Sequence, residues 1–367
     1  MRTFVTTEQH LVDILNAPIS DVRQKIVRKQ HRILLSTISP DDKLDLTNRS
    51  LLNLHRTGVQ IFPYSDFVNN ITKTPEKLRC LSIPILYLDI DRESARNISS
   101  QYGVCCISAE DTETPFILRR GWDIETTDPD KEKSWDFLLK NIDKHSNSAV
   151  IIDRYLFASM NNKHNDDPDD NIEDSFDNLE AIISNILPAE IADGLFTITI
   201  VFSKQAINSG IRGRKTSFED VIKRIEDIRT KIDRPYSFNI EVIALDNGSK
   251  ENNNPNKCFY YNDTHDRFVI TNYYVIEAAH MLKAFRKGGI SLTKQKIALR
   301  YAYSAGMEEG DISSIPAMTQ ERVIDCLVKL ITQPDNIVND CLVYALNGEI
   351  KTIDYENPSK NRLLGKN

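Results

Sequence analysis

The chain has 367 residues, 40% of them hydrophobic, so it is long and apolar enough for two folded domains and is not intrinsically disordered. Its formal net charge of −7 excludes a global positive field that would draw it onto nucleic acid or an anionic membrane, so such binding needs a local patch. The six cysteines lack C-x-x-C spacing, which predicts reduced thiols. Because the sequence has no signal peptide and no apolar run of about 18 residues, we expect a cytoplasmic protein with no transmembrane segment.

Residues 1–128 form the expected N-terminal domain, of α/β or helical type. Apolar residues at helical spacing predict that residues 1–60 are rich in helix. From Leu81 the pattern changes to strand, helix and strand, with Asp91 as the helix cap. The predicted spans are 82–90, 92–102 and 103–108. A polar stretch then places the domain boundary near Asp128.

Residues 129–290 form the second expected domain, a mixed sheet flanked by helices. Three apolar runs predict buried strands, and two amphipathic stretches between them predict helices long enough to cross the sheet. Two further strands are expected to close the sheet. The predicted strands are 148–157, 195–203, 237–245, 257–263 and 265–278, and the predicted helices are 172–186 and 217–232. This β-α-β-α-β-β order predicts that the first three strands are neighbours in one sheet.

Residues 291–367 are expected to form a helical C-terminal appendage. From about Ala278 onward, apolar residues recur at spacings compatible with helices. The predicted helices are 279–285, 293–305, 319–331 and 337–346. This part of the chain is therefore expected to pack against the second domain rather than to extend its sheet.

The motif His265-Asp266-Arg267, followed by four residues and Asn272, has the spacing H-x-R-x4-N at the start of a strand. It resembles the H-x-K-x4-D motif of the phospholipase D superfamily, with arginine for lysine and asparagine for aspartate. The resemblance implies that His265 attacks phosphorus, that Arg267 neutralises phosphate oxygens and that Asn272 orients the imidazole. Asn272 carries no charge to support an imidazolium, and the G-S-x-N that follows the motif in the superfamily is absent here. Loss of catalysis is therefore expected.

A closer resemblance is to the phospholipase-D-like C-terminal domain of MIT-domain proteins, over residues 148–290. That domain has a D-P-Y-I strand followed by an H-D-R motif, and here Asp153-Arg154-Tyr155-Leu156 precedes His265-Asp266-Arg267. The family binds phosphoinositides and membranes, which implies phosphate recognition in this chain. We therefore expect Asp153 and Tyr155 to lie near His265 and to contribute to ligand binding.

Three other segments are weaker candidate sites. The basic loop with Arg212, Arg214 and Lys215 precedes a helix N-terminus and could bind phosphate, although a solvated loop is the plainer interpretation. A D-x-D at Asp89 resembles haloacid-dehalogenase-like phosphatases, but Glu93 stands where that family needs threonine or valine. The acidic run at 166–170 lacks the glycine and terminal glutamate of a calcium loop. Walker A, G-x-S-x-G and zinc motifs are missing from the sequence, so no cofactor or metal is predicted.

The leading functional hypothesis is a phosphate-recognising module that binds nucleic acid inside a larger assembly. Bacterial antiviral defence proteins that join a degenerate nuclease fold to a sensing half are an analogy for such an assembly. The first alternative is an active phosphodiesterase or nuclease in which a homodimer supplies the second histidine. The second alternative is an inert structural or interaction protein.

Overall fold

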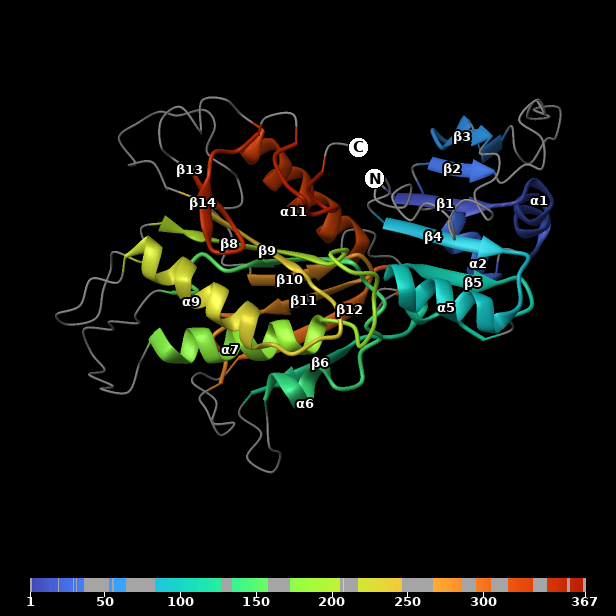
Figure 1. The fold of residues 1–367 in the computed structure, drawn as a ribbon. Coiled ribbons are helices and arrows are strands. Elements are labelled where there is room, and N and C mark those ends of the chain that lie inside the picture. The colour runs from blue at the N-terminus through green and yellow to red at the C-terminus, as the bar shows by residue number, and fades with distance from the viewer. Residues whose placement is uncertain are drawn as a thin grey trace.

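Two β-sheets with helices on their faces make up the structure, a computed structural model (Figure 1). It describes residues 2–18, 20–28, 30, 32–35, 53–54, 56–63, 83–111, 113–126, 134–157, 172–204, 207, 217–245, 267–285, 295–304, 316–332, 342–354 and 357–365. One sheet is parallel and the other is mixed, which confirms the predicted mixed α/β fold.

The N-terminal sheet has five parallel strands in the order β3-β2-β1-β4-β5. The strands are β1 (Arg2–Thr6), β2 (Arg32–Leu35), β3 (Gln60–Pro63), β4 (Ile83–Leu88) and β5 (Cys105–Ser108). The helices are α1 (Glu8–Asn16), α2 (Val22–Val27) and α5 (Arg92–Tyr102). Asp91 caps α5 as predicted, because its carboxylate accepts a hydrogen bond from the Ser94 N–H at 2.8 Å. Within the described part of residues 1–60, α1 and α2 are the expected helices, and the buried strands β1 and β2 accompany them.

The second sheet has nine strands in the order β14-β13-β9-β8-β7-β10-β11-β12-β6. The strands are β6 (Trp122–Glu125), β7 (Ser148–Ile152), β8 (Thr197–Ser203), β9 (Asn239–Leu245), β10 (Arg267–Thr271), β11 (Tyr274–Ala278), β12 (Lys296–Tyr301), β13 (Leu342–Leu346) and β14 (Glu349–Lys351). As predicted, β7, β8 and β9 are parallel neighbours. The predicted strand at 257–263 lies outside the described residues.

The C-terminal part of the chain extends this sheet, so the predicted helical appendage is wrong. Two of the expected helices are the strands β12 and β13, and only 319–331 forms a helix, α11 (Pro316–Ile331). In β12 the buried residues alternate, with Ile297, Leu299 and Tyr301 facing inward, which is the spacing of a strand. Strand β6 also pairs with β12, so the second sheet begins before the predicted boundary at Asp128.

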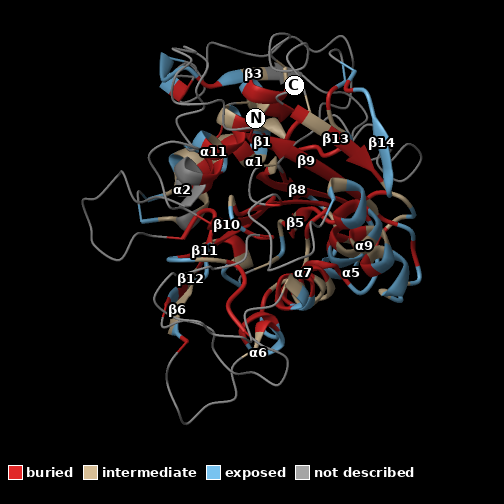
Figure 2. Cartoon of the chain, turned by 90° about the vertical axis from the view of Figure 1, so that its left-hand side faces the viewer, coloured by how far each residue is buried: buried red, intermediate tan, exposed pale blue. Residues whose placement is uncertain are grey.

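Helices cover both faces of the nine-stranded sheet (Figure 1). The helices α6 (Trp135–Leu139), α7 (Ile172–Ile186) and α9 (Phe218–Lys231) lie on one face, and α11 lies on the other. In β7, Ala149 and Ile151 pack with α7 and α9, whereas Val150 and Ile152 belong to the core that includes α11. Figure 2 shows the resulting concentration of buried residues in the central strands. A strand that is apolar on both faces is the pattern expected for a covered parallel sheet.

The two sheets share their hydrophobic cores and are joined by buried polar contacts. Residues of β1 and β4 enter the same clusters as residues of β7. In the turn between β10 and β11, the Tyr273 hydroxyl accepts a hydrogen bond from the Cys105 N–H at 2.8 Å and donates one to the Pro84 carbonyl. Arg2 forms an ion pair with Glu321 of α11 at 3.1 Å. The N-terminal sheet is therefore packed against the second sheet rather than tethered to it.

A glycine at this junction provides a test of that packing. Gly103 ends α5 with a φ of +59°, and a Cβ there would lie 2.3 Å from the Ser146 carbonyl oxygen and 2.9 Å from Ile191 Cδ1. We expect Gly103→Ala to lower the free energy of unfolding by about 2–4 kcal/mol, from left-handed strain and overpacking together. The matched control is Gly58→Ala, where φ is +90° but nothing lies within 4 Å, so only strain applies. Urea unfolding of both variants measures the difference, and equal losses would contradict a close junction.

Candidate functional site

The candidate site lies at the edge of the nine-stranded sheet that points away from the five-stranded sheet, on the left in Figure 1. Parallel β7 and β8 end there, and antiparallel β10 begins there. The pairing of Phe268 with Ile152 places Arg267 beside Asp153, the residue that follows β7. The strand register therefore joins the two motifs that the sequence separates by more than a hundred residues.

Asp153 is fully buried, and its two carboxylate oxygens have different partners. Oδ1 accepts a hydrogen bond from the Tyr155 N–H at 2.9 Å, and Oδ2 accepts one from the Leu282 N–H at 2.8 Å. Arg267 Nε lies 3.8 Å from Oδ1. Burial raises the pKa of Asp153 above its ordinary value, while the two N–H groups and Arg267 act in the opposite direction. Asp153 thus shapes the turn after β7 and provides a counter-charge for Arg267.

Arg267 carries a buried hydrogen-bond donor that is not satisfied. Its side chain is 8% exposed, and its Nε has no hydrogen-bond partner among the residues that the structure describes. The Tyr155 ring centroid lies 5.8 Å from the guanidinium carbon of Arg267 and 5.1 Å from that of Arg154. Tyr155 is 41% exposed. A buried cation with an open donor therefore lies next to an aromatic ring that faces solvent.

The loop 279–285, which follows β11, adjoins Asp153 and is held by buried side chains. Asn178 Oδ1 accepts hydrogen bonds from the N–H groups of Ala284 and Phe285 at 3.1 and 3.0 Å. Gln295 Oε1 accepts from the N–H groups of His280 and Met281 at 3.0 and 3.1 Å. The predicted helix at 279–285 is therefore wrong, because these side chains take over backbone groups that a helix would pair internally. These hydrogen bonds hold the loop in a defined conformation beside the Asp153–Arg267 pair.

The predicted site residues fall into three groups. Asp153, Tyr155 and Arg267 lie together. His265 and Asp266 lie outside the described residues, as do Arg212, Arg214 and Lys215 of the predicted basic loop.

Asn272, the third group, lies at the opposite end of β10. Its side-chain oxygen accepts hydrogen bonds from the N–H groups of Asn147 and Ser148, both at 3.0 Å, where β7 begins. The prediction that Asn272 acts together with Arg267 is therefore wrong. The physical reason is the extended strand between them, which separates their α-carbons by roughly 16 Å at about 3.3 Å per residue. Asn272 has a structural role at the start of β7 instead.

Sequence reasoning missed Asn178 and Gln295, the residues that shape the loop. Asn178 lies on the apolar face of α7, among Ser175, Leu179 and Ile182, and is almost fully buried. A polar side chain on an apolar helical stripe needs hydrogen-bond partners, which is a signal that the sequence contains. Its partners could not have been named, because they come from α6 and from the loop after β11.

The described residues form neither a metal centre nor a membrane-spanning helix. Within the described ranges, no group of three or more His, Cys, Asp or Glu side chains is arranged to hold a metal ion. None of the described helices combines the length and apolar character needed to cross a membrane. No known family model matches the chain, and no curated protein or solved structure is significantly similar to it.

Proposed function

We propose that the chain is a phosphate-recognising module of phospholipase-D-like type that binds single-stranded nucleic acid at Arg267 and Tyr155. The observation that supports this most directly is the buried Nε of Arg267, which lacks a hydrogen-bond partner among the described residues. A buried donor without a hydrogen-bond partner costs about 1–3 kcal/mol. A ligand that accepts a hydrogen bond from this donor removes that cost when it binds. A phosphate oxygen suits an arginine, since the guanidinium binds phosphate in a planar, charge-assisted geometry.

The position of Tyr155 favours nucleic acid over other phosphate-bearing ligands. Its exposed ring lies within 6 Å of two guanidinium groups, those of Arg154 and Arg267. Aromatic rings beside cations are the elements that single-strand binding proteins use, because bases stack on the ring while arginines contact the backbone. A phosphoinositide headgroup has no base to stack. The net charge of −7 is compatible with this proposal, because binding would depend on a local patch and not on the global field.

The test is a titration of fluorescent single-stranded DNA, single-stranded RNA, duplex DNA and phosphoinositide vesicles at several salt concentrations. Arg267→Ala is expected to weaken single-strand binding by about 1–3 kcal/mol and to lower the slope of log affinity against log salt by about 1, since one phosphate contact is lost. Tyr155→Ala is expected to weaken binding by about 1–3 kcal/mol with an unchanged salt slope, because stacking does not displace counterions. Tyr155→Phe keeps the ring and should bind like the wild type.

The matched control is Phe137→Ala, which removes another exposed aromatic ring that lies 4.7 Å from a lysine ammonium group, that of Lys140. It should leave the affinity unchanged. Equal losses in Phe137→Ala and Tyr155→Ala would contradict a specific site. Binding to the vesicles but not to the oligonucleotides would retain phosphate recognition and overturn the assignment of nucleic acid. Cleavage of the oligonucleotides that is abolished by His265→Ala would favour the nuclease alternative.

A further inference from the structure

The depth of Arg267 limits which phosphate groups can reach its buried donor. The Arg267 side chain is 8% exposed and its Nε is buried, so the exposed part lies elsewhere on the side chain. Asp153, beside it, is fully buried, whereas the Tyr155 ring is 41% exposed. The cation therefore lies below the surface, next to an aromatic ring that reaches the solvent.

The carboxylate beside Arg267 does not take up this donor. Asp153 Oδ1 lies 3.8 Å from Arg267 Nε, which is beyond hydrogen-bonding distance. The two oxygens of Asp153 instead accept hydrogen bonds from the N–H groups of Tyr155 and Leu282. Burial raises the pKa of Asp153, which favours its neutral form and lessens its repulsion of a bound anion. Asp153 therefore leaves the Nε donor of Arg267 open to a phosphate oxygen.

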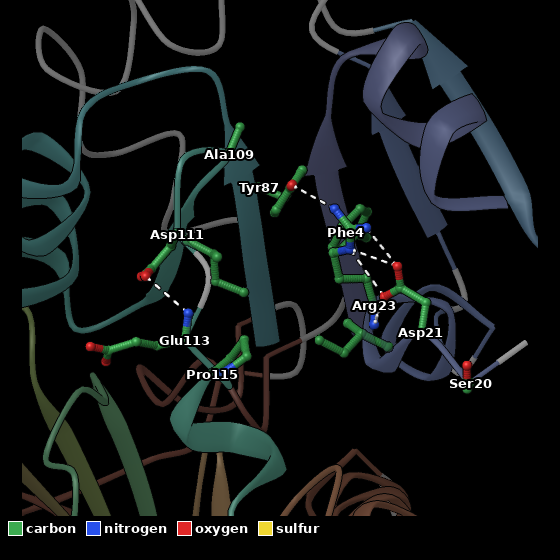
Figure 3. A pocket seen from close by; sticks show the side chains of 11 residues that line it. Phe4, Ser20, Asp21, Arg23, Tyr87, Ala109, Asp111, Glu113 and Pro115 are labelled. Atoms are coloured by element: carbon green, nitrogen blue, oxygen red, sulfur yellow. Dashed lines mark hydrogen bonds and ion pairs between the residues drawn. The ribbon is translucent and has the colours of Figure 1, made fainter. Parts of the chain in front are cut away.

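Arg23 shows the opposite arrangement, although it lines a cavity of about 500 Å³ between α2 and the segment after β5 (Figure 3). Its Nε lies 3.0 and 3.1 Å from the two carboxylate oxygens of Asp21, and its Nη1 donates to the Tyr87 hydroxyl at 3.1 Å. The hydrogen bond from Arg23 lowers the pKa of Asp21, which keeps that carboxyl ionised. Because Arg23 is already paired with an anion, it gains less from a phosphate than Arg267 does. Arg23 is therefore a matched control for Arg267.

The phosphates at the ends of a single strand differ from those in its interior. An internal phosphodiester carries one negative charge and has a sugar on both sides. A terminal phosphate has a sugar on one side only, presents three oxygens and carries a charge of about −1.5 to −2 at pH 7. It can therefore approach a cation of which little is exposed, and its larger charge interacts more strongly with a partly buried guanidinium.

We infer that Arg267 binds the terminal phosphate of a single strand, with the base of the terminal nucleotide stacked on Tyr155. The inference rests on the proposed function, because it specifies which part of the nucleic acid the site recognises. The Tyr155 ring centroid lies 5.8 Å from the guanidinium carbon of Arg267, so that one nucleotide can contact both. An internal phosphodiester contacts only the exposed part of the Arg267 side chain, because its second sugar keeps it away from the buried Nε. The site thus distinguishes the end of a strand from its interior.

The experiment is isothermal titration of the full chain with four forms of one deoxythymidine oligonucleotide. The forms are linear with a 5′-phosphate, linear with a 3′-phosphate, linear with hydroxyl groups at both ends, and circular. We expect one phosphorylated form to bind at least about tenfold more tightly than the hydroxyl-ended form, the scale of one charge-assisted hydrogen bond. That form identifies which end the site recognises. The circular form, which has no end, should bind no more tightly than the hydroxyl-ended form.

The ratio of the affinities for the phosphorylated and hydroxyl-ended forms is compared within each variant, so that a fraction of unfolded protein affects both forms equally. Arg267→Ala should remove the preference and make the two affinities equal. Arg267→Lys keeps a positive charge beside Asp153 but loses the planar fork, and it should reduce the preference. Arg23→Ala should keep the wild-type ratio. Tyr155→Ala should weaken both forms by the same factor, because the ring stacks on a base in either case.

Three outcomes would overturn the inference, and they differ in what they imply for the proposed function. Equal affinities for all four forms, with an equal loss in Arg267→Ala, would overturn end recognition and retain single-strand binding at Arg267. A preference that survives in Arg267→Ala, or that is lost in Arg23→Ala, would overturn the assignment of the terminal phosphate to Arg267. Absence of binding by every form would overturn both the inference and the proposed function.

Discussion

Asp153→Ala is expected to lower the free energy of unfolding by about 3–5 kcal/mol, the scale for removing one partner of a buried ion pair. The substitution deletes the acceptor of the Tyr155 and Leu282 N–H groups and the carboxylate that lies 3.8 Å from Arg267 Nε. Each buried N–H left without a partner costs about 1–3 kcal/mol. Urea unfolding at pH 7, followed by circular dichroism, measures the loss. A loss below about 1 kcal/mol, the scale of an exposed ion pair, would contradict a buried pair at this edge of the sheet.

The same carboxyl predicts a pH dependence of stability. Burial is the largest influence on Asp153 and raises its pKa in the folded state, so folded protein binds this proton more tightly than unfolded protein does. The stabilisation from that proton is fully present below the unfolded pKa of about 4 and is lost as the pH rises through the folded pKa. Asp153→Asn cannot titrate. The unfolding free energy of the wild type minus that of Asp153→Asn should therefore decrease as the pH rises from about 4. A difference that stays constant up to neutral pH would show that the pKa is not raised.

Glu241→Ala is expected to lower the free energy of unfolding by about 3 kcal/mol or more. The substitution leaves several buried donors without an acceptor, and each costs about 1–3 kcal/mol. Glu241 is fully buried in β9, and its carboxylate accepts hydrogen bonds from the Thr199 and Tyr344 hydroxyls at 2.9 and 3.0 Å. It also accepts from the Ser359 hydroxyl and the Lys360 N–H. One carboxylate thus connects three neighbouring strands to the C-terminal segment.

Glu241→Ala should also loosen the C-terminal segment 357–365, in addition to lowering the stability of the whole fold. Beside Glu241, the Asn361 side chain donates to the Ala149 carbonyl at 2.7 Å, and Leu364 is fully buried. We expect Glu241→Ala to expose the segment 357–365 to carboxypeptidase digestion at rates well above those of the wild type. Glu349→Ala is the control, since this carboxylate of β14 is largely exposed and its substitution should cost less than about 0.5 kcal/mol. Unchanged digestion in Glu241→Ala would show that the segment is held by its apolar contacts alone.

The sequence by itself determined the elements whose signals are local. The strands β7, β8 and β9 were predictable, because unbroken apolar runs of this length identify strands that are covered on both faces. The helices between these strands and the Asp91 cap were also predictable, because amphipathic spacing and capping depend on residues only a few positions apart. The order of the two short motifs also led to the expectation that Asp153 and Tyr155 lie near His265. His265 lies outside the described residues, but Arg267 of the same motif lies beside Asp153.

Only the tertiary structure decided which short apolar segments became strands and which residues share a site. The segments that form β12 and β13 fit helical spacing as well as strand spacing, and pairing with β11 and β9 selected the strand, because a strand is stabilised mainly by its neighbours. Asn272 was separated from Arg267 by the direction of β10, which spacing along the chain does not reveal. The cavity between α2 and the segment after β5 arises in the same way, from a strand order that exists only once the sheet has formed.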